Sequence, residues 1–192
     1  MTALVVFESM FGNTETIARS IAAGLAARLG DDVVEVVEVG DAPAALPAGV
    51  DLLVVGGPTH AFGMSRRGTR QSARQQADGP LVSTGGGIRE WLGSLEVPPG
   101  PRIAAAAFDT RIPRPRLPGS ASGSATRRLR TLGFRIVARR CSFWVTGVKG
   151  PLRAGEVERA REWGDRVAAE ATTSTAQPAR AAPRRRPRSR LA

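Results

Sequence analysis

The sequence contains no tyrosine, and its 192 residues include a single cysteine, a single histidine and a single lysine. Cys141 alone excludes an internal disulfide framework and fits a reducing cytoplasm. A catalytic thiol or hydroxyl needs a base partner, and His60 is the only histidine. The sequence shows no Ser/His/Asp set and no metal cluster, so we expect no catalytic side chain and no metal site.

The apolar runs of the sequence are all short, and none of them could span a bilayer. Met1-Thr2-Ala3 leads directly into a short apolar run, without the basic start of a secretory signal. We therefore expect a cytoplasmic protein without a membrane span.

Acidic residues are absent from the segment 171–192, which contains six arginines together with Pro, Ser and Thr. This segment has no apolar periodicity, so we expect a disordered basic tail after a domain that covers residues 1–170. Without the six arginines, the formal net charge falls from +11 to +5. Few aromatic residues lie among the basic ones, so we do not expect nucleic acid as a partner.

Apolar strand-like runs alternate with helical patterns along the rest of the chain. This order predicts an α/β three-layer sandwich around a five-stranded parallel sheet with strand order 2-1-3-4-5. The expected strands are 3–7, 33–39, 52–56, 103–108 and a fifth, which an interruption could divide, within 134–145. The expected helices are 14–29, 65–76, 88–95, 124–133 and 153–171.

In such a sheet, ligands bind beyond the carboxyl ends of the strands, at the point where the connections after strands 1 and 3 run in opposite directions. Three segments are expected at this edge. The first loop follows strand 1 and contains Ser9, Met10, Phe11, Gly12, Asn13 and Thr14; the second and third segments follow strands 3 and 4.

The first loop has no Walker lysine and no G-x-G-x-x-G spacing. It offers hydroxyl groups and backbone amides at the start of a helix, where the helix dipole attracts an anion. Several aligned N–H donors can bind a phosphate without a counter-charge. Thr14 is also a plausible helix N-cap, and a capped turn without a ligand is the alternative interpretation.

The stretch "VVFESMFGNTETIARSIAAGL", residues 5–25, resembles the flavodoxin signature in the order Val5-Val6-Phe7-x-Ser9-x-x-Gly12-x-Thr14-x-x-x-Ala18-x-x-Ile21. The resemblance covers about residues 2–170 and implies a flavodoxin-like fold. It also implies FMN as cofactor, with the 5′-phosphate in the first loop. Phe11 stands where classical flavodoxins have Ser or Thr, and "SMFG" is similar to the "SMYG" loop of flavodoxin-like quinone reductases.

The resemblance implies that two further segments border the isoalloxazine ring. The second loop consists of Pro58, Thr59, His60, Ala61, Phe62 and Gly63. His60 and Phe62 are expected at the ring face, with a surface position as the alternative for His60. Gly63 is the candidate for a peptide flip on flavin reduction.

The third segment consists of Phe108, Asp109 and Thr110. Phe108 is the nearest aromatic residue that could stack on the flavin. Alternatively, it ends strand 4 inside the core.

Three functions agree with these patterns. The first is a small FMN-binding protein that transfers electrons between redox partner proteins or to a small acceptor. The second is an FMN-dependent NAD(P)H:quinone-type oxidoreductase, which the "SMFG" loop favours. The third is a flavodoxin-like interaction module that has lost its flavin.

Overall fold

The computed structural model describes residues 1–100, 102–113 and 119–175. The elements, in chain order, are β1 (Thr2–Phe7), α1 (Asn13–Leu29), a 3₁₀ turn (Asp31–Val33), β2 (Val34–Glu38), β3 (Val50–Pro58), α2 (Arg67–Gln75), α3 (Ile88–Ser94), β4 (Ala104–Arg111), α4 (Ala121–Thr131), β5 (Arg135–Ile136), β6 (Cys141–Trp144) and α5 (Glu156–Thr175).

All strand pairs in the sheet are parallel, and the strand order is β2-β1-β3-β4-β5. This confirms the predicted architecture. β1, β3 and β4 occupy the centre, and their apolar residues are buried because helices cover both faces.

The fifth strand position is divided between two segments, as the sequence suggested. Both β5 and β6 pair with β4: Ala104 lies opposite Arg135, and Phe108 lies opposite Cys141. Between these two pairs the chain advances by four residues along β4 but by six along the edge, from Arg135 to Cys141. These extra residues interrupt the edge strand between β5 and β6.

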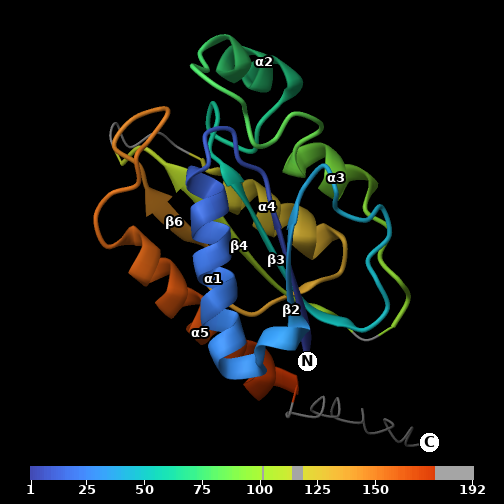
Figure 1. Cartoon of the computed structure of the whole chain (residues 1–192). Helices are drawn as coiled ribbons and strands as arrows, with labels where there is room; N and C mark the ends of the chain where they lie inside the picture. The colour runs from blue at the N-terminus through green and yellow to red at the C-terminus, as the bar shows by residue number, and fades with distance from the viewer. Residues whose placement is uncertain (101, 114–118, 176–192) are drawn as a thin grey trace, which may run out of the picture.

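Two clusters of buried side chains fill the layers on either side of the sheet. One joins the sheet to α1 and α5, and the other joins it to α3 and α4. α2 covers neither face; it lies beyond the carboxyl edge of the strands, at the top of Figure 1. The loops that follow β1, β3 and β4 therefore lie at the edge of the sheet where the ligand was predicted.

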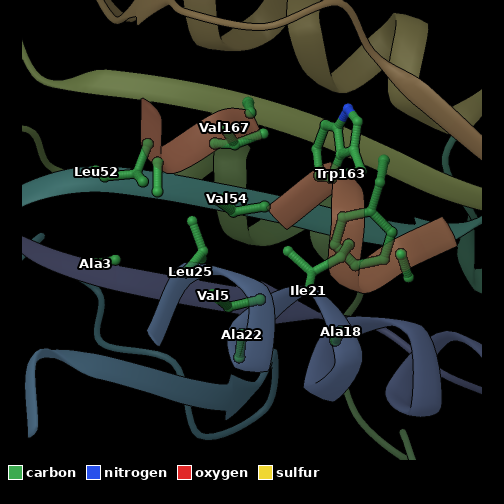
Figure 2. Packing of buried hydrophobic residues seen from close by; sticks show 14 of the residues in the cluster. Ala3, Val5, Ala18, Ile21, Ala22, Leu25, Leu52, Val54, Trp163 and Val167 are labelled. Carbon is green, nitrogen blue, oxygen red and sulfur yellow. The ribbon is translucent and has the colours of Figure 1, made fainter. Parts of the chain in front are cut away.

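Helices α1 and α5 cross at very short range because a glycine lies at each contact. A Cβ atom on Gly24 would lie 2.0 Å from the backbone oxygen of Arg161, and one on Gly164 would lie 2.2 Å from that of Ile21. Beside this contact, Ile21, Leu25 and Trp163 point into the layer between helices and sheet (Figure 2). The glycines thus set the distance between the two helices.

The last helix continues to Thr175, five residues beyond the expected domain boundary at 170. Ala171 is fully buried against the core. Residues 176–192, which make up most of the expected basic tail, lie outside the described residues. Among the described helices, none is long and apolar enough to cross a membrane.

Gly24→Ala and Gly164→Ala are each expected to lower the free energy of unfolding by about 1–3 kcal/mol, because the added methyl group overlaps the facing backbone. Alanine normally stabilises a helix interior by roughly 0.5–1 kcal/mol relative to glycine. Gly93→Ala, at a glycine of α3 with open space around it, is the control and should be neutral or stabilising. Urea unfolding of the three variants measures these differences, and a Gly24→Ala variant as stable as the control would contradict the close contact.

Candidate functional site

The first loop leads into α1 through a glycine with a left-handed backbone. Gly12 is the N-cap residue, with φ 82°, and no side chain makes a capping hydrogen bond. The predicted capping role of Thr14 is wrong, because the helix already begins at Asn13 and Thr14 lies within its first turn. The amides of this first turn have no partner inside the helix.

The hydroxyl of Thr14 instead meets a hydroxyl from the third segment. Thr14 Oγ1 and Thr110 Oγ1 are 2.7 Å apart, and both side chains are buried. One hydroxyl donates to the other, so the pair keeps one further proton that can be donated to a ligand. Thr14 and Thr110 were both predicted at the site, and although they are 96 positions apart in the sequence, their side chains are in contact.

The second loop forms a tight turn between His60 and Gly63. Each donates its backbone N–H to the carbonyl of the other, at 2.9 and 3.0 Å. The two residues between them, Ala61 and Phe62, have φ of 41° and 73°. The left-handed backbone of this turn thus falls on two non-glycine residues, at a cost of roughly 1–3 kcal/mol each.

The ring of Phe108 does not reach the site. It is fully buried and packs edge-on against Phe143 and Trp163, with ring centroids 6.2 and 6.3 Å away. A Cβ atom on Gly56 would lie 2.1 Å from this ring, so the glycine makes room for Phe108 inside the core. The predicted flavin-stacking role of Phe108 is therefore wrong. Phe108 is a core residue in the second half of β4, which was the alternative interpretation.

Asp109 is also fully buried and acts on a helix. Its Oδ2 accepts hydrogen bonds from the backbone N–H and the hydroxyl of Ser122, at 2.9 and 2.6 Å, at the start of α4. Its Oδ1 has no hydrogen-bond partner among the described residues. Asp109 therefore fixes the position of α4 behind the site.

The three predicted segments converge on one cleft with a volume of about 120 Å³. Nine of the predicted residues line it: Ser9, Met10, Phe11, Asn13, Thr14, Pro58, Thr59, His60 and Thr110. The remaining predicted residues, Gly12, Ala61, Phe62, Gly63, Phe108 and Asp109, lie outside this lining.

Four further residues line the cleft that the sequence analysis did not assign: Arg111, Ile112, Val145 and Val148. The last two belong to the segment after β6. Asn13 Nδ2 donates to the carbonyl of Lys149 at 2.9 Å, which ties this segment to the start of α1. Because β6 is parallel to β1, its carboxyl end could have been expected at the same edge of the sheet.

Exposed apolar side chains surround the mouth of the cleft. Ile112 and Val148 line it and are 36% and 65% exposed. Phe62 is 51% exposed but does not line the cleft. The site therefore combines buried hydroxyl groups on the inside with an apolar rim on the outside.

Behind the second loop, Glu8 is buried at the end of β1. Its Oε2 accepts the backbone N–H of Ile88 at 3.0 Å, at the start of α3, and its Oε1 has no hydrogen-bond partner among the described residues. A Cβ atom on Gly87 would lie 2.5 Å from Glu8 Oε2 and 2.7 Å from both Ser65 Oγ and Arg70 Nη1. The carboxylate, the hydroxyl and the guanidinium therefore converge beneath the α-carbon of Gly87.

Burial is the main cause of the shifted pKa values of two groups near the site, Glu8 and His60. It raises the pKa of Glu8, outweighing Ser65, the Ile88 amide and Arg70, which all lower it. Burial, with a smaller effect of Arg70, lowers the pKa of His60. The environment therefore favours a neutral imidazole at the cleft.

Comparisons with known proteins agree with this geometry. The family model described as Flavodoxin matches residues 5–78, a segment that contains both the first and the second loop. No curated protein matches the chain in sequence.

Solved structures show the same fold along nearly the whole chain. A flavodoxin from the domain Archaea is 18% identical, with 90% of this chain and 99% of that chain covered and a TM-score of 0.57. Oxidised flavodoxin 1 from Bacillus cereus is 19% identical, with coverage of 90% and 98% and a TM-score of 0.59. The flavodoxin, WrbA-like protein from Agrobacterium tumefaciens is 16% identical, with coverage of 90% and 98% and a TM-score of 0.51. The chain thus has a flavodoxin-like fold, as the resemblance of its first loop implied.

Glu8→Gln is expected to remove a pH-dependent component of stability. With its pKa raised in the folded state, Glu8 binds more protons there than in the unfolded chain, so stability falls as pH rises from its ordinary pKa of 4.5 through the folded value. The substituted glutamine side chain does not titrate but can still accept the Ile88 N–H. The unfolding free energy of the variant minus that of the wild type should therefore rise across this window and level off above it.

Urea unfolding from about pH 4 to about pH 9 measures this difference. Glu35→Gln, which changes an exposed carboxylate of β2, is the control. Parallel stability curves for Glu8→Gln and the wild type would show that the folded pKa of Glu8 is not raised.

Proposed function

We propose that the chain binds FMN at this cleft and functions as a redox protein that transfers electrons through the bound flavin. The observation that carries the proposal is the convergence of the loops after β1, β3 and β4 on one cleft at the start of α1. The flavodoxin match over residues 5–78 supports the same choice of cofactor.

The first turn of α1 would hold the phosphate. Gly12 has no side chain that could occupy the helix N-terminus, so the amides of this turn remain available to an anion. The Thr14–Thr110 hydroxyl pair lies beside them and has a proton to donate. The first loop contains no lysine or arginine, so its own contribution to phosphate binding is a set of aligned neutral donors.

The outer part of the cleft suits a flat, mainly apolar ring. Its volume of about 120 Å³ is below the roughly 300–1,000 Å³ of pockets that enclose a drug-sized ligand, so the ring would be only partly enclosed. Ile112 and Val148 offer apolar contacts around it, and His60 offers a neutral hydrogen-bonding group. The bound flavin supplies the electron-transfer chemistry, while an accessible ring edge lets electrons reach a second molecule.

The direct test is the identity of the resident ligand. The purified protein should be yellow, and mass spectrometry of the ligand released by heat should find FMN. Recovery of FAD, or a protein that stays colourless after incubation with excess FMN, would refute the proposal; the second result would favour the interaction module. Sustained NAD(P)H oxidation with a quinone would instead indicate the stand-alone oxidoreductase.

Thr14→Val is expected to weaken FMN binding by about ten- to a hundredfold, because one hydrogen bond to a charged group contributes roughly 1.5–3 kcal/mol. The loss should be smaller for riboflavin, which has no phosphate. Thr110→Val should have a similar effect, since it removes the partner hydroxyl. Fluorescence titration of the apoprotein with both ligands measures the ratio.

Thr131→Val, an exposed substitution at the end of α4, is the matched control and should leave both affinities unchanged. Equal weakening of FMN and riboflavin by Thr14→Val would indicate general damage to the fold. Unchanged FMN affinity would show that the phosphate does not lie at this pair.

A further inference from the structure

A second, larger hollow lies beside α2, apart from the cleft. This groove has a volume of about 700 Å³ and shares no lining residue with the cleft. Its lining comes from one face of α2 and from a glycine-containing loop: Arg67, Arg70, Gln71, Arg74, Gln75, Thr84, Gly85 and Gly86.

The helical wall of the groove is strongly basic. Arg67, Arg70 and Arg74 are spaced by three and four residues, which places them on one side of α2. No acidic residue occurs between Asp51 and Asp78, so α2 contains no carboxylate to neutralise them. The three arginines therefore lie along about 10 Å of one side of the helix.

Only the middle arginine of this row has an ionic partner among the described residues. Arg70 is 9% exposed, and its Nη1 contacts Ser65 Oγ at 2.8 Å and Glu90 Oε2 at 3.1 Å. Arg67 and Arg74 form no salt bridge with any described residue, and Arg74 donates to the carbonyl of Thr84 across the groove. The outer two charges are therefore available to a ligand.

The opposite wall leaves space and backbone polar groups. A Cβ atom on Gly85 would meet nothing within 4 Å, and one on Gly86 would meet only Glu90 Cβ at 4.0 Å. Because glycine has no side chain, the backbone of these residues is accessible from the groove. The groove thus has guanidinium groups on one side and a hydroxyl residue, Thr84, with bare backbone on the other.

We propose that this groove binds a small organic anion that carries two or more phosphate charges. Arginine is suited to such a ligand, because its planar guanidinium group binds phosphate oxygens through two parallel hydrogen bonds. The separation of Arg67 and Arg74 fits two phosphates better than one, and the volume leaves room for the organic part. Arg70, fixed at the floor by Ser65 and Glu90, adds a charge whose position is already set.

The groove is spatially distinct from the proposed flavin site. The phosphate of FMN would lie on neutral donors at α1, whereas the groove lies on the arginines of α2. Binding in the groove therefore requires neither the flavin nor the Thr14–Thr110 pair.

Calorimetric titration of the full chain with inorganic pyrophosphate, at roughly 0.1 M salt to screen diffuse attraction, tests the proposal. The wild type should bind one equivalent in the groove, and R67Q/R74Q should weaken that binding by about tenfold or more. The matched control is R153Q/R161Q, which removes the same charge from exposed positions in and just before α5. It should change the affinity by less than about twofold.

Four results would overturn the proposal. The first is the absence of pyrophosphate binding, and the second is equal weakening by both double variants, which would indicate general attraction to a basic protein. The third is loss of pyrophosphate binding with Thr14→Val, or on saturation with FMN, because the anion would then lie at α1. The fourth is a protein that binds poly-glutamate but does not bind pyrophosphate, because the groove would then be a docking face for an acidic protein. Circular dichroism and thermal unfolding of each variant show whether it is folded.

Discussion

The parallel direction of every strand in the sheet is the constraint on which the site depends. Each strand ends at the same edge, and the helices that follow β1, β3 and β4 begin beyond it, so buried strand ends meet helix N-termini with unpaired amides. At β1 and β4 the chain satisfies such amides with its own carboxylates: Glu8 accepts from Ile88, and Asp109 accepts from Ser122. The start of α1 has no comparable side-chain cap, since its N-cap residue is Gly12. Of the starts of α1, α3 and α4, the one whose amides donate to no such side chain among the described residues borders the cleft.

The two carboxylates also fix the helices behind the loops of the cleft. Each has one oxygen on a helix amide and one without a hydrogen-bond partner among the described residues. An unpaired oxygen in a buried carboxylate is unfavourable unless the group is neutral or another interaction compensates. At Glu8 burial raises the pKa, which reduces the penalty by favouring the neutral acid. The buried acid can therefore hold the start of α3 without a full charge inside the protein.

The sequence was sufficient for the features that depend on local pattern: the apolar runs predicted the sheet and α1, and the first loop predicted most of one wall of the cleft. Contacts between distant segments were not predictable in this way. Phe108 could be placed in the core only once the rings around it were seen, and the place of Val145 and Val148 at the cleft follows from the pairing of β6 with β4. The positive φ of Ala61 and Phe62 in the second loop was not predictable either, because local propensity disfavours this conformation at non-glycine residues and the hydrogen-bonded turn between His60 and Gly63 imposes it.

The two proposed anion sites, the cleft and the groove, would attract their ligands on different physical grounds. In the first turn of α1, helix amides and the Thr14–Thr110 hydroxyl pair can hold an anion without any formal positive charge. Along α2, the unneutralised charges of Arg67 and Arg74 provide attraction without a helix N-terminus. Arg70 lies between the two environments: it lines the groove, and its charge also lowers the pKa of His60 at the cleft. An anion in the groove would offset part of that charge and make His60 easier to protonate, so occupancy of one site would change the electrostatic potential at the other.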